Sequence, residues 1–411
     1  MKKRYAFVGA SLRAQCMFAQ GIREHFSDVA EISGVYDINP GRSAYFASTN
    51  NTKAYDSFEE MLNTEKPDAV IVTTVDVYHS DYIIRAMQMG YDVITEKPLT
   101  IDAQRCQMIL DAEKTTKNKL TVTFNYRYSP YNTRIKQLLT EGVIGDIYSV
   151  HFEWSLDRSL VLSGHGASYY RRWNSIMEKS GGLLVHKSTH HFDMVNWFLS
   201  DSPARVGAFG KLNVYGAKNA PWTDCGETCR TCPHAEECEF YYEQSPDELA
   251  RYQAHEHYDD YHKDACVYRD EVNIYDTMAV LVEYRRGALL SYSLNATAAY
   301  EGWKMIINGS KGRLEAVNVE TGLQAIRDTD VIRVFDLNNQ VSEYAMPHYV
   351  EGHAGGDIRL LRDVFVGVQD DPLKHAASTV DGVNSVIIGA LANKSIATGK
   401  FICVDDEITL G

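Results

Sequence analysis

The segment HKSTHHFD, residues 186–193, gathers three histidines, a lysine and an aspartate in eight consecutive positions. Imidazole can accept or donate a proton near neutral pH, and it is also a common metal ligand. If the segment is helical, His186, His190 and Asp193 share one face, because they are spaced at i, i+4 and i+7. Two histidines four residues apart have the spacing of helical zinc ligands, but the usual glutamate between them is absent and Lys187 opposes a cation. The residue types and their spacing alone leave open a proton-transfer site, a metal site and a polar helix face.

A lysine directly after a short apolar run is the second candidate for proton chemistry. Lys97 stands in Glu96-Lys97-Pro98, which follows a predicted strand at residues 92–95. An ammonium can hydrogen-bond a hydroxyl or a ketone, and burial lowers the pKa of a lysine toward neutrality. Glu96 could orient the lysine, and a cis bond before Pro98 would aim its side chain. The alternative is a solvated lysine in an ordinary β–α loop.

The turn Gly9-Ala10-Ser11-Leu12-Arg13-Ala14 is a degenerate form of the dinucleotide-binding sequence G-x-G-x-x-G. Serine replaces the second glycine, and alanine is accepted in place of the third. Asp37 follows the second predicted strand, where a carboxylate accepts both ribose hydroxyls of NAD and repels the 2′-phosphate of NADP. Arg42 could counter that repulsion. The turn and the acid together favour NAD over NADP, and an ordinary strand-to-helix turn is the alternative.

Alternating strands and helices in the first third of the chain must position these residues. We expect strands at residues 5–8, 30–36, 69–73 and 92–95, and helices at 12–26 and 80–89. The run AVIVT at 69–73 is apolar on every side, as in a central strand of a parallel sheet. The pattern predicts an α/β fold in which residues 1–124 form a doubly wound parallel sheet of the Rossmann type.

The remainder, residues 125–411, is predicted to be an α+β domain with a large open, mainly antiparallel sheet. Many of its apolar segments alternate with polar residues, as strands with one solvated face do. We expect strands at residues 148–154, 206–214, 277–284, 288–296, 304–308 and 312–317, and helices at 355–369 and 379–398. A polar insertion rich in cysteine, histidine, tyrosine and glutamate interrupts this domain at about 215–273.

Composition and net charge argue against two classes of binding partner. The chain has 411 residues, a formal net charge of −14 and 45% hydrophobic residues. An acidic surface repels nucleic acid and anionic membranes, so neither is an expected partner. No apolar run approaches the roughly 20 residues of a membrane helix. We therefore expect a cytoplasmic protein.

Four cysteines within the insertion raise the question of a structural metal. Cys225, Cys229, Cys232 and Cys238 are spaced C-x₃-C-x₂-C-x₅-C. Tetrahedral zinc would satisfy four thiolates and would hold together a segment too polar to fold alone. Zinc is the tentative prediction, and disulfides or free thiols are the alternatives.

Several motifs, in this order, make the chain resemble the Gfo/Idh/MocA oxidoreductases, the glucose–fructose oxidoreductase and inositol dehydrogenase group. The motifs are Gly9 in the first turn, Thr73-Thr74 with His79, Glu96-Lys97-Pro98, Asn125-Tyr126-Arg127, Ser180-Gly181-Gly182 and SIATGK at 395–400. The tripeptide alone proves little, whereas the ordered set is specific and spans almost the whole chain. The resemblance also implies a homodimer or homotetramer built through the open sheet of the second domain.

The resemblance implies roles for individual residues. Lys97 maps onto a catalytic lysine beside the nicotinamide ring, and His190 maps onto the histidine that handles the substrate proton. His186 stands where the family usually has an aspartate, and it is a third catalytic candidate. The cofactor-binding candidates are Gly9, Ser11, Leu12, Arg13, Asp37, Arg42, Thr73, Thr74, His79, Glu96 and Lys97. The substrate-binding candidates, drawn from polar and aromatic segments, are Tyr126, Arg127, His165, Tyr170, Arg172, Trp173, Lys187 and His353.

These features predict an NAD-dependent dehydrogenase that oxidises a secondary hydroxyl of a sugar, cyclitol or glycoside by hydride transfer to nicotinamide C4. A second reading is a glycosidase or lyase in which tightly bound NAD oxidises the sugar transiently and a substituent is then eliminated. A third is a non-catalytic sensor of NAD or sugar. The presence of both Lys97 and His190 argues against that third reading.

Overall fold

The strands of the first third of the chain form one six-stranded, all-parallel sheet in the computed structural model, which describes residues 2–160, 162–350 and 352–409. The strand order is β3-β2-β1-β4-β5-β6. The strands are β1 (Lys3–Val8), β2 (Ala30–Tyr36), β3 (Ala54–Tyr55), β4 (Ala69–Val72), β5 (Asp92–Thr95) and β6 (Leu120–Val122). The order reverses at β1 and β4, so the carboxyl ends of these two strands flank the crevice where doubly wound sheets bind nucleotides. The prediction of a Rossmann-type sheet is confirmed.

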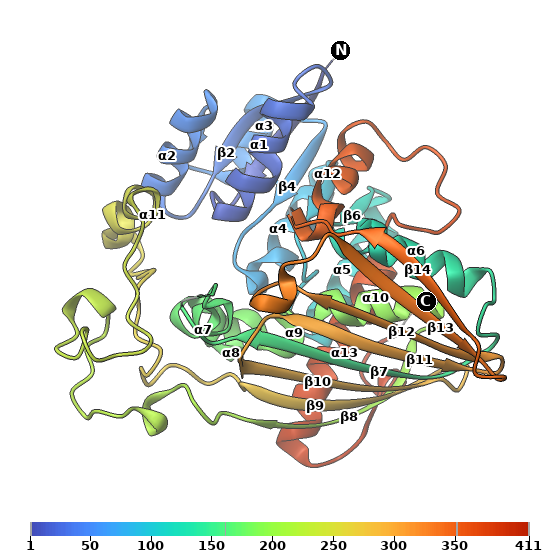
Figure 1. Cartoon of the computed structure of the whole chain (residues 1–411). Coiled ribbons are helices and arrows are strands. Elements are labelled where there is room, and N and C mark those ends of the chain that lie inside the picture. The colour runs from blue at the N-terminus through green and yellow to red at the C-terminus, as the bar shows by residue number, and fades with distance from the viewer. Residues whose placement is uncertain (1, 161, 351, 410–411) are drawn as a thin grey trace.

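Helices cover both faces of this sheet (Figure 1). They are η1 (Ala14–Ala19), α1 (Gln20–His25), α2 (Pro40–Asn50), α3 (Phe58–Glu65), η2 (Asp76–Tyr78), α4 (His79–Gln88) and α5 (Ala103–Thr116). Asn39, Ser57 and Asp102 cap the amino ends of α2, α3 and α5 with their side chains. Caps of this kind satisfy backbone N–H groups that have no partner within the helix. The stretch expected to be one regular helix after the first turn instead opens with the π-helix η1.

The second sheet has nine strands in the order β14-β13-β12-β11-β7-β10-β9-β8-β15. The strands are β7 (Ile147–Asp157), β8 (Pro203–Lys211), β9 (Thr277–Tyr284), β10 (Leu289–Ala298), β11 (Gly302–Gly309), β12 (Gly312–Val319), β13 (Thr329–Asp336), β14 (Val341–Pro347) and β15 (Ile402–Cys403). The pair β7–β10 is parallel, and the other pairs are antiparallel. The mainly antiparallel open sheet predicted for this part of the chain is confirmed.

The helices of the second part lie against one face of this sheet and against the first sheet (Figure 1). They are η3 (Asn125–Tyr128), α6 (Pro130–Thr140), α7 (His165–Arg171), η4 (Trp173–Ser175), α8 (Met177–Ser180), α9 (Leu183–His186), α10 (Thr189–Leu199), η8 (Leu323–Ala325), α12 (Gly352–Phe365), α13 (Thr379–Thr398) and η9 (Val404–Asp406). Among the helices of the described chain, none has the length and apolar character needed to cross a bilayer.

One late helix, α12, packs on the Rossmann sheet rather than on the second sheet. Phe365 contacts the rings of Tyr5 and Phe26, and Leu361 lies against Gly21. These residues belong to one buried apolar cluster. The boundary predicted at residues 124 and 125 stays a prediction, because the chain returns to the first unit at α12.

The insertion expected at about 215–273 leaves the second sheet after β8 and returns at β9. It contains η5 (Ala217–Asn219), η6 (Cys229–Thr231), α11 (Pro246–Arg251) and η7 (Gln253–Tyr258), joined by irregular segments. In Figure 1 it is the yellow-green arch at the left, and α11 lies beside α2 of the Rossmann unit. The insertion therefore connects the two sheets on the side opposite to α12.

Candidate functional site

Lys97 lies where the two units meet. It follows β5, its bond to Pro98 is cis, and its ammonium donates a hydrogen bond to the backbone oxygen of His186 at 2.9 Å. Burial lowers the pKa of Lys97 to about 8, although the carboxylates of Asp76 and Glu96 oppose the shift. An amine with this pKa can release and recover a proton near neutral pH. The lysine predicted from its sequence context is thus poised for proton exchange beside the histidine segment.

Asp76, in η2, is a member of the site that sequence reasoning missed. Its Oδ2 lies 2.6 Å from Nδ1 of His186, and its side chain is buried. Burial raises the pKa of Asp76 well above its usual range, whereas the charge of Lys97 opposes this shift. Burial also lowers the pKa of His186 well below its usual value. The short contact alone would indicate an ion pair, but these shifts favour a neutral His186 that donates from Nδ1 and presents Nε2 as an acceptor.

His190 is buried against aromatic rings at the start of α10. Its ring stacks on Tyr126 with a centroid distance of 4.5 Å, and His353 lies 5.6 Å away on the same side. Burial, followed by the charge of Lys97, lowers the pKa of His190 well below 6.5. Within the described chain, its Nδ1 has no hydrogen-bond partner. A neutral imidazole is suited to accept a proton from a bound hydroxyl.

The helix expected across residues 186–193 is interrupted. His186 ends α9, Lys187 and Ser188 form a turn, and α10 begins at Thr189. The single shared face predicted for His186, His190 and Asp193 is therefore wrong. Because Ser188 donates its N–H to the oxygen of Leu183 rather than Leu184, the chain turns and separates the two histidines.

The turn after β1 fits a dinucleotide. Gly9 has φ +92°, and a Cβ there would meet the backbone of Thr73 and Thr74 at 2.7 Å. Thr73 donates its hydroxyl to the oxygen of Gly9 at 2.7 Å, so β1 and β4 hold the turn between them. The Asp37 carboxylate accepts the N–H of Ala10 at 2.7 Å, which fixes the acid beside the turn. Only glycine allows the backbone approach that the phosphate-binding turn requires.

Other cofactor candidates connect this turn to neighbouring loops and helices. Arg13 donates to Glu96 at 2.8 Å and lies 3.6 Å from Asp357 of α12. Both ring nitrogens of His79 face backbone oxygens, those of Pro98 and Thr74. His79 therefore joins two loops rather than facing the crevice. The hydroxyl of Ser11 accepts the N–H of Ala14 at the start of the helix. Leu12, Thr74 and Arg42 remain partly exposed at this edge of the sheet.

Charged side chains surround the histidines on the side of the second sheet. Lys187 is buried over the face of Trp154, and its Nζ lies 3.9 Å from Glu301. Burial alone would lower the pKa of Lys187, but Tyr169 and Glu301 raise it above its usual value. Nδ1 of His165 lies 2.8 Å from Glu301. Lys187 and His165 are therefore arranged around one carboxylate at this side of the site.

Arg172 and Trp173 also lie close to the histidine segment. The indole of Trp173 lies edge-on to His186 with a centroid distance of 5.4 Å, and the guanidinium of Arg172 lies over Tyr169. The charge of Arg172 further lowers the pKa of His186. Both side chains are partly exposed, so they remain available to a ligand.

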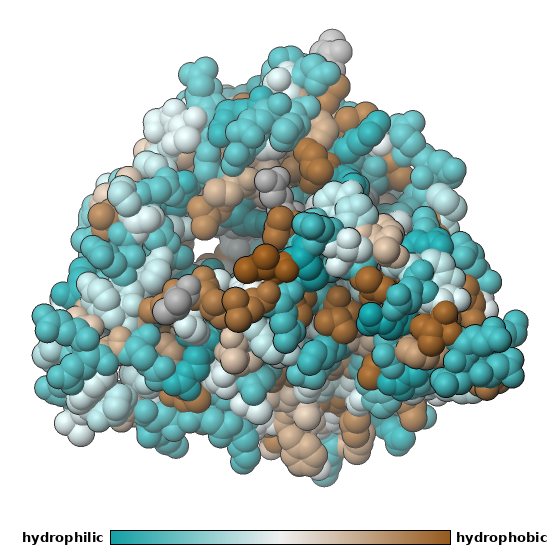
Figure 2. All heavy atoms as spheres, viewed as in Figure 1, coloured by the Kyte–Doolittle hydropathy of each residue, from teal (hydrophilic) through white to brown (hydrophobic). Residues whose placement is uncertain are grey.

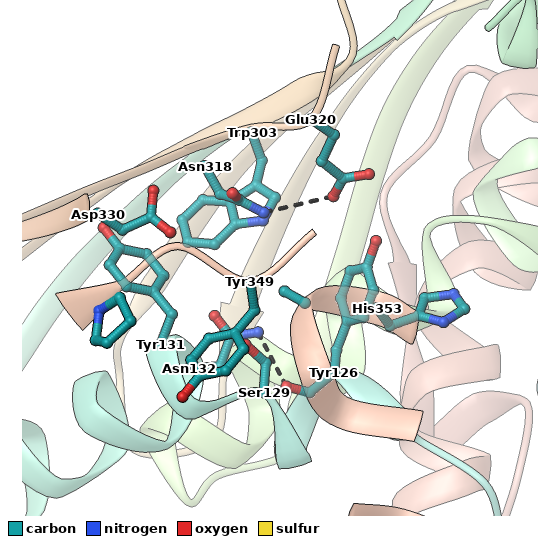
Figure 3. A pocket seen from close by; sticks show the side chains of 12 residues that line it. Tyr126, Ser129, Tyr131, Asn132, Trp303, Asn318, Glu320, Asp330, Tyr349 and His353 are labelled. Carbon is teal, nitrogen blue, oxygen red and sulfur yellow. Dashed lines mark hydrogen bonds between the residues drawn. The ribbon is translucent and has the colours of Figure 1, made fainter. Parts of the chain in front are cut away.

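A narrow pocket opens beside Tyr126 and His353 (Figure 3). Its walls carry the rings of Tyr126, Tyr131, Trp303 and Tyr349 and the polar groups of Ser129, Asn132, Asn318, Glu320, Asp330 and His353. In Figure 3, Glu320, which directly follows β12, reaches toward the side on which the Tyr126 hydroxyl lies. The surrounding protein and the charge of Glu301 raise the pKa of Glu320 to about 7, although water reaches its side chain. Aromatic faces with a few polar groups are typical of small-molecule sites.

Two substrate candidates are buried structural residues. Arg127 pairs with Asp193 through two hydrogen bonds, at 2.6 and 2.8 Å, and also donates to the backbone oxygen of Lys374. Tyr170 is fully buried, donates to the oxygen of Tyr275 and stacks on Tyr215. Their polar groups already have partners inside the fold, so the predicted substrate role of Arg127 and Tyr170 is wrong.

The structure does not support the zinc site predicted at Cys225, Cys229, Cys232 and Cys238. All four are free thiols. In the described part of the chain, no three His, Cys, Asp or Glu side chains are gathered closely enough to hold a metal ion. The guanidinium of Arg171 donates to the sulfur of Cys229 at 3.1 Å, and a cation in that place opposes a metal. The insertion is held by such contacts instead.

Comparison with known proteins places both units in one family. The model of the oxidoreductase family with an NAD-binding Rossmann fold, GFO_IDH_MocA, matches residues 3–124. The model of the C-terminal alpha/beta domain of the same family matches residues 136–404. Together they cover most of the chain.

Individual relatives agree with this result. "Putative oxidoreductase YteT" of Bacillus subtilis (strain 168) is 38% identical over 97% of each chain. Inositol 2-dehydrogenase of Rhizobium meliloti (strain 1021) is 24% identical over 82% of this chain and 81% of its own. The crystal structure of the WlbA dehydrogenase from Bordetella pertussis, in complex with NADH and UDP-GlcNAcA, has a TM-score of 0.67 at 17% identity, covering 98% and 99% of the two chains. At that identity the likeness concerns the fold. The chain belongs to the Gfo/Idh/MocA oxidoreductase family.

Proposed function

We propose that this protein is an NAD-dependent dehydrogenase that oxidises a secondary hydroxyl of a sugar, cyclitol or glycoside. One observation carries the proposal. Lys97, with a pKa lowered to about 8, contacts the segment that bears two buried neutral histidines, His186 and His190, at the end of the nucleotide-binding sheet. Bound NAD would supply the hydride acceptor at nicotinamide C4.

The residues of the chain account for the proton of the hydroxyl. Neutral Lys97 and the neutral imidazole of His190 can each accept it, because burial lowers the pKa of both groups. Asp76 stabilises the protonated form of Lys97 by its charge and orients His186 through Nδ1. Positioned acid–base groups of this kind contribute about 10²–10⁴-fold to a rate.

The lining of the site supports a hydroxyl-rich substrate. Trp173 and Tyr126 offer flat apolar faces, while Lys187, Arg172 and His165 offer hydrogen-bond donors. Sugars and cyclitols present both an apolar ring face and several hydroxyls. The inositol 2-dehydrogenase among the similar proteins is consistent with this substrate class.

A screen of sugars, cyclitols and glycosides with NAD tests the proposal. Accumulation of NADH together with a product two hydrogens lighter than the substrate is expected for at least one compound. Cleavage of a glycoside without net NADH would instead favour the route through transient oxidation and elimination.

Lys97→Met tests the assignment of the lysine, because it keeps the length of the side chain and removes the amine. We expect kcat to fall by about 10²–10⁴-fold. Lys114→Met makes the same change at an exposed position in α5 and should leave kcat unchanged. Full turnover in Lys97→Met would remove Lys97 from the mechanism.

The proposal includes a homodimer or homotetramer formed through the open face of the second sheet. Phe209 and Leu281 project from β8 and β9 on that face and are exposed. A hollow of about 570 Å³ lies over it, lined also by Ile306, Glu153 and Lys304. Apolar side chains with adjacent charges of both signs suit a contact with a second copy of the same face.

A further inference from the structure

The tip of the insertion contacts the segment that follows Asp37 through hydrogen bonds and close packing. Asn39 is fully buried, and its Nδ2 donates to the backbone oxygen of His255 at 2.9 Å and to Oδ1 of Asp259 at 3.0 Å. A Cβ on Gly41 would meet the ring of His255 at 2.3 Å, so the insertion approaches α2 as closely as a glycine permits. The contact is therefore a packed interface rather than a loop lying near a surface.

The insertion also pairs with the guanidinium of Arg42, the cation that lies beside Asp37. Both terminal nitrogens of Arg42 donate to the carboxylate of Asp259, and Nη2 lies 3.6 Å from Asp37. The side chains of Arg42 and Asp37 are each only 11% exposed. Arg42 thus faces two carboxylates, and the three groups together carry a net negative charge. The residue that could have neutralised a 2′-phosphate is already neutralised.

Two aromatic residues of the insertion extend this contact toward the phosphate-binding turn. The hydroxyl of Tyr252 lies against the backbone of Leu12 in that turn, and its side chain is buried. Tyr261 packs edge-on against Tyr252 and lies under the guanidinium of Arg42. The insertion therefore forms one wall of the nucleotide crevice, along the stretch between Leu12 and Asp37.

The arch is anchored at both ends in the other unit. At the end of the arch Arg269 donates to the oxygen of Tyr170, and at its start the hydroxyl of Tyr215 donates to the oxygen of Ala296 in β10. Figure 2 shows the surface hollowed between the Rossmann unit and this arch. A ligand on the first turn would lie under a segment held by both units.

We propose that the insertion at 215–273 is a cofactor strap, in which Asp259 and Tyr252 complete the adenosine side of the NAD site, select against NADP and slow the release of the dinucleotide. The inference rests on the proposed function for its cofactor and adds residues that the Rossmann unit alone does not contain. A 2′-phosphate adds about two negative charges to a place where two carboxylates already outnumber one guanidinium.

Asp259→Asn tests the selection. The amide keeps the shape of the side chain but leaves Arg42 with one carboxylate. Binding of NADH and of NADPH is measured separately, by nicotinamide fluorescence without substrate. The ratio of the Kd for NADPH to the Kd for NADH should fall by about tenfold. This is the size expected for the loss of one charge-assisted hydrogen bond. Asp260→Asn removes the neighbouring charge, whose side chain is 95% exposed, and should leave the ratio unchanged.

Tyr252→Ala tests retention. Stopped-flow displacement of NADH should be about tenfold faster than in the unaltered protein, and Tyr252→Phe should show a smaller change because it keeps the ring. Thermal melting of each variant confirms that it is folded. Unchanged Kd ratio and release rate in the folded variants, or equal shifts in Asp259→Asn and Asp260→Asn, would overturn the strap. NADH binding with these shifts but no oxidation of any sugar would leave the strap standing and refute the proposed function.

Discussion

At the scale of single residues, the site combines groups from both units around one amine. Lys97 and Asp76 come from the Rossmann unit, and His186 and His190 come from the second unit. The resemblance maps His186 onto a position where the family usually has an aspartate, and Asp76 brings a carboxylate to its Nδ1. The carboxylate that contacts His186 therefore comes from the Rossmann unit.

The lowered pKa of Lys97 predicts the pH dependence of oxidation. Oxidation requires the neutral amine, because it accepts the proton. The pH profile of kcat/KM should therefore have one ascending limb, which rises through about pH 8 and levels off above it. His190 adds no limb in this range, because its pKa lies well below 6.5 and it is already neutral. Initial rates with saturating NAD across this range measure the limb. Its absence would mean that Lys97 does not carry the proton.

Asp76→Asn should move that limb to lower pH. The carboxylate of Asp76 raises the pKa of Lys97, so its removal lets burial lower this pKa further. Asp76→Glu should restore the limb, and Asp81→Asn, at an exposed position in α4, should leave it in place. The same pH profile serves as the measurement, and an unmoved limb in Asp76→Asn would show that the two groups are not coupled.

At the scale of elements, one buried guanidinium ties three helices together. Arg127 lies in η3, its partner Asp193 lies in α10, and Asp381 of α13 is 3.2 Å from Nη2 of Arg127. Because α10 also carries His190, this cluster sets the position of the proton acceptor. Its role is to position the helix rather than to touch the substrate.

Arg127→Ala should destabilise the protein by about 3–5 kcal/mol, because it leaves the buried Asp193 without its partner. Chemical denaturation gives the free energy of unfolding. Arg333→Ala in β13 breaks a half-exposed pair with Glu343 of β14 and should cost no more than about 1 kcal/mol. Equal losses in the two variants would contradict the structural role of Arg127.

The elements of the fold follow from hydrophobic periodicity wherever a face is clearly apolar. The segments predicted at 30–36, 92–95, 277–284 and 379–398 coincide with β2, β5, β9 and α13. Strands β13 and β14 were not predicted, since their exposed edge carries many polar residues. Periodicity reports which side of an element is buried, so short or polar edge strands give little signal.

The site was harder to predict, because pairing between distant segments leaves no local pattern. The loop and helix positions of Lys97 and His190 follow from motifs, but the bond between Asp76 and His186 joins residues 110 positions apart. The place of Asp76 in Thr74-Val75-Asp76, just after a central strand, is the one sequence signal that could have indicated it. Arg127 was a substrate candidate because of its place at the opening of the second domain, whereas its buried pair with Asp193 indicates a structural role.

At the scale of the whole molecule, the nine-stranded sheet leaves one face without a helical layer. Register places Gly207, Leu281, Ser291, His151 and Ile306 in one row across five strands of this face. Phe209 is 81% exposed in the adjacent row, which also holds Glu153 opposite Lys304. Large exposed apolar side chains on a flat sheet mark a binding surface in a soluble protein.

Replacing Phe209 and Leu281 by glutamate should separate the copies. Two charges on each face repel one another and cannot be desolvated in a contact between identical surfaces, so the assembly should dissociate to a monomer. Light scattering coupled to size-exclusion chromatography gives the mass. Leu323→Glu makes the same change at a side chain that is 89% exposed outside this face and should leave the mass unaltered. A monomeric parent protein, or a double variant of undiminished mass, would show that this face does not join copies, and the sheet would then need another explanation for its exposed phenylalanine.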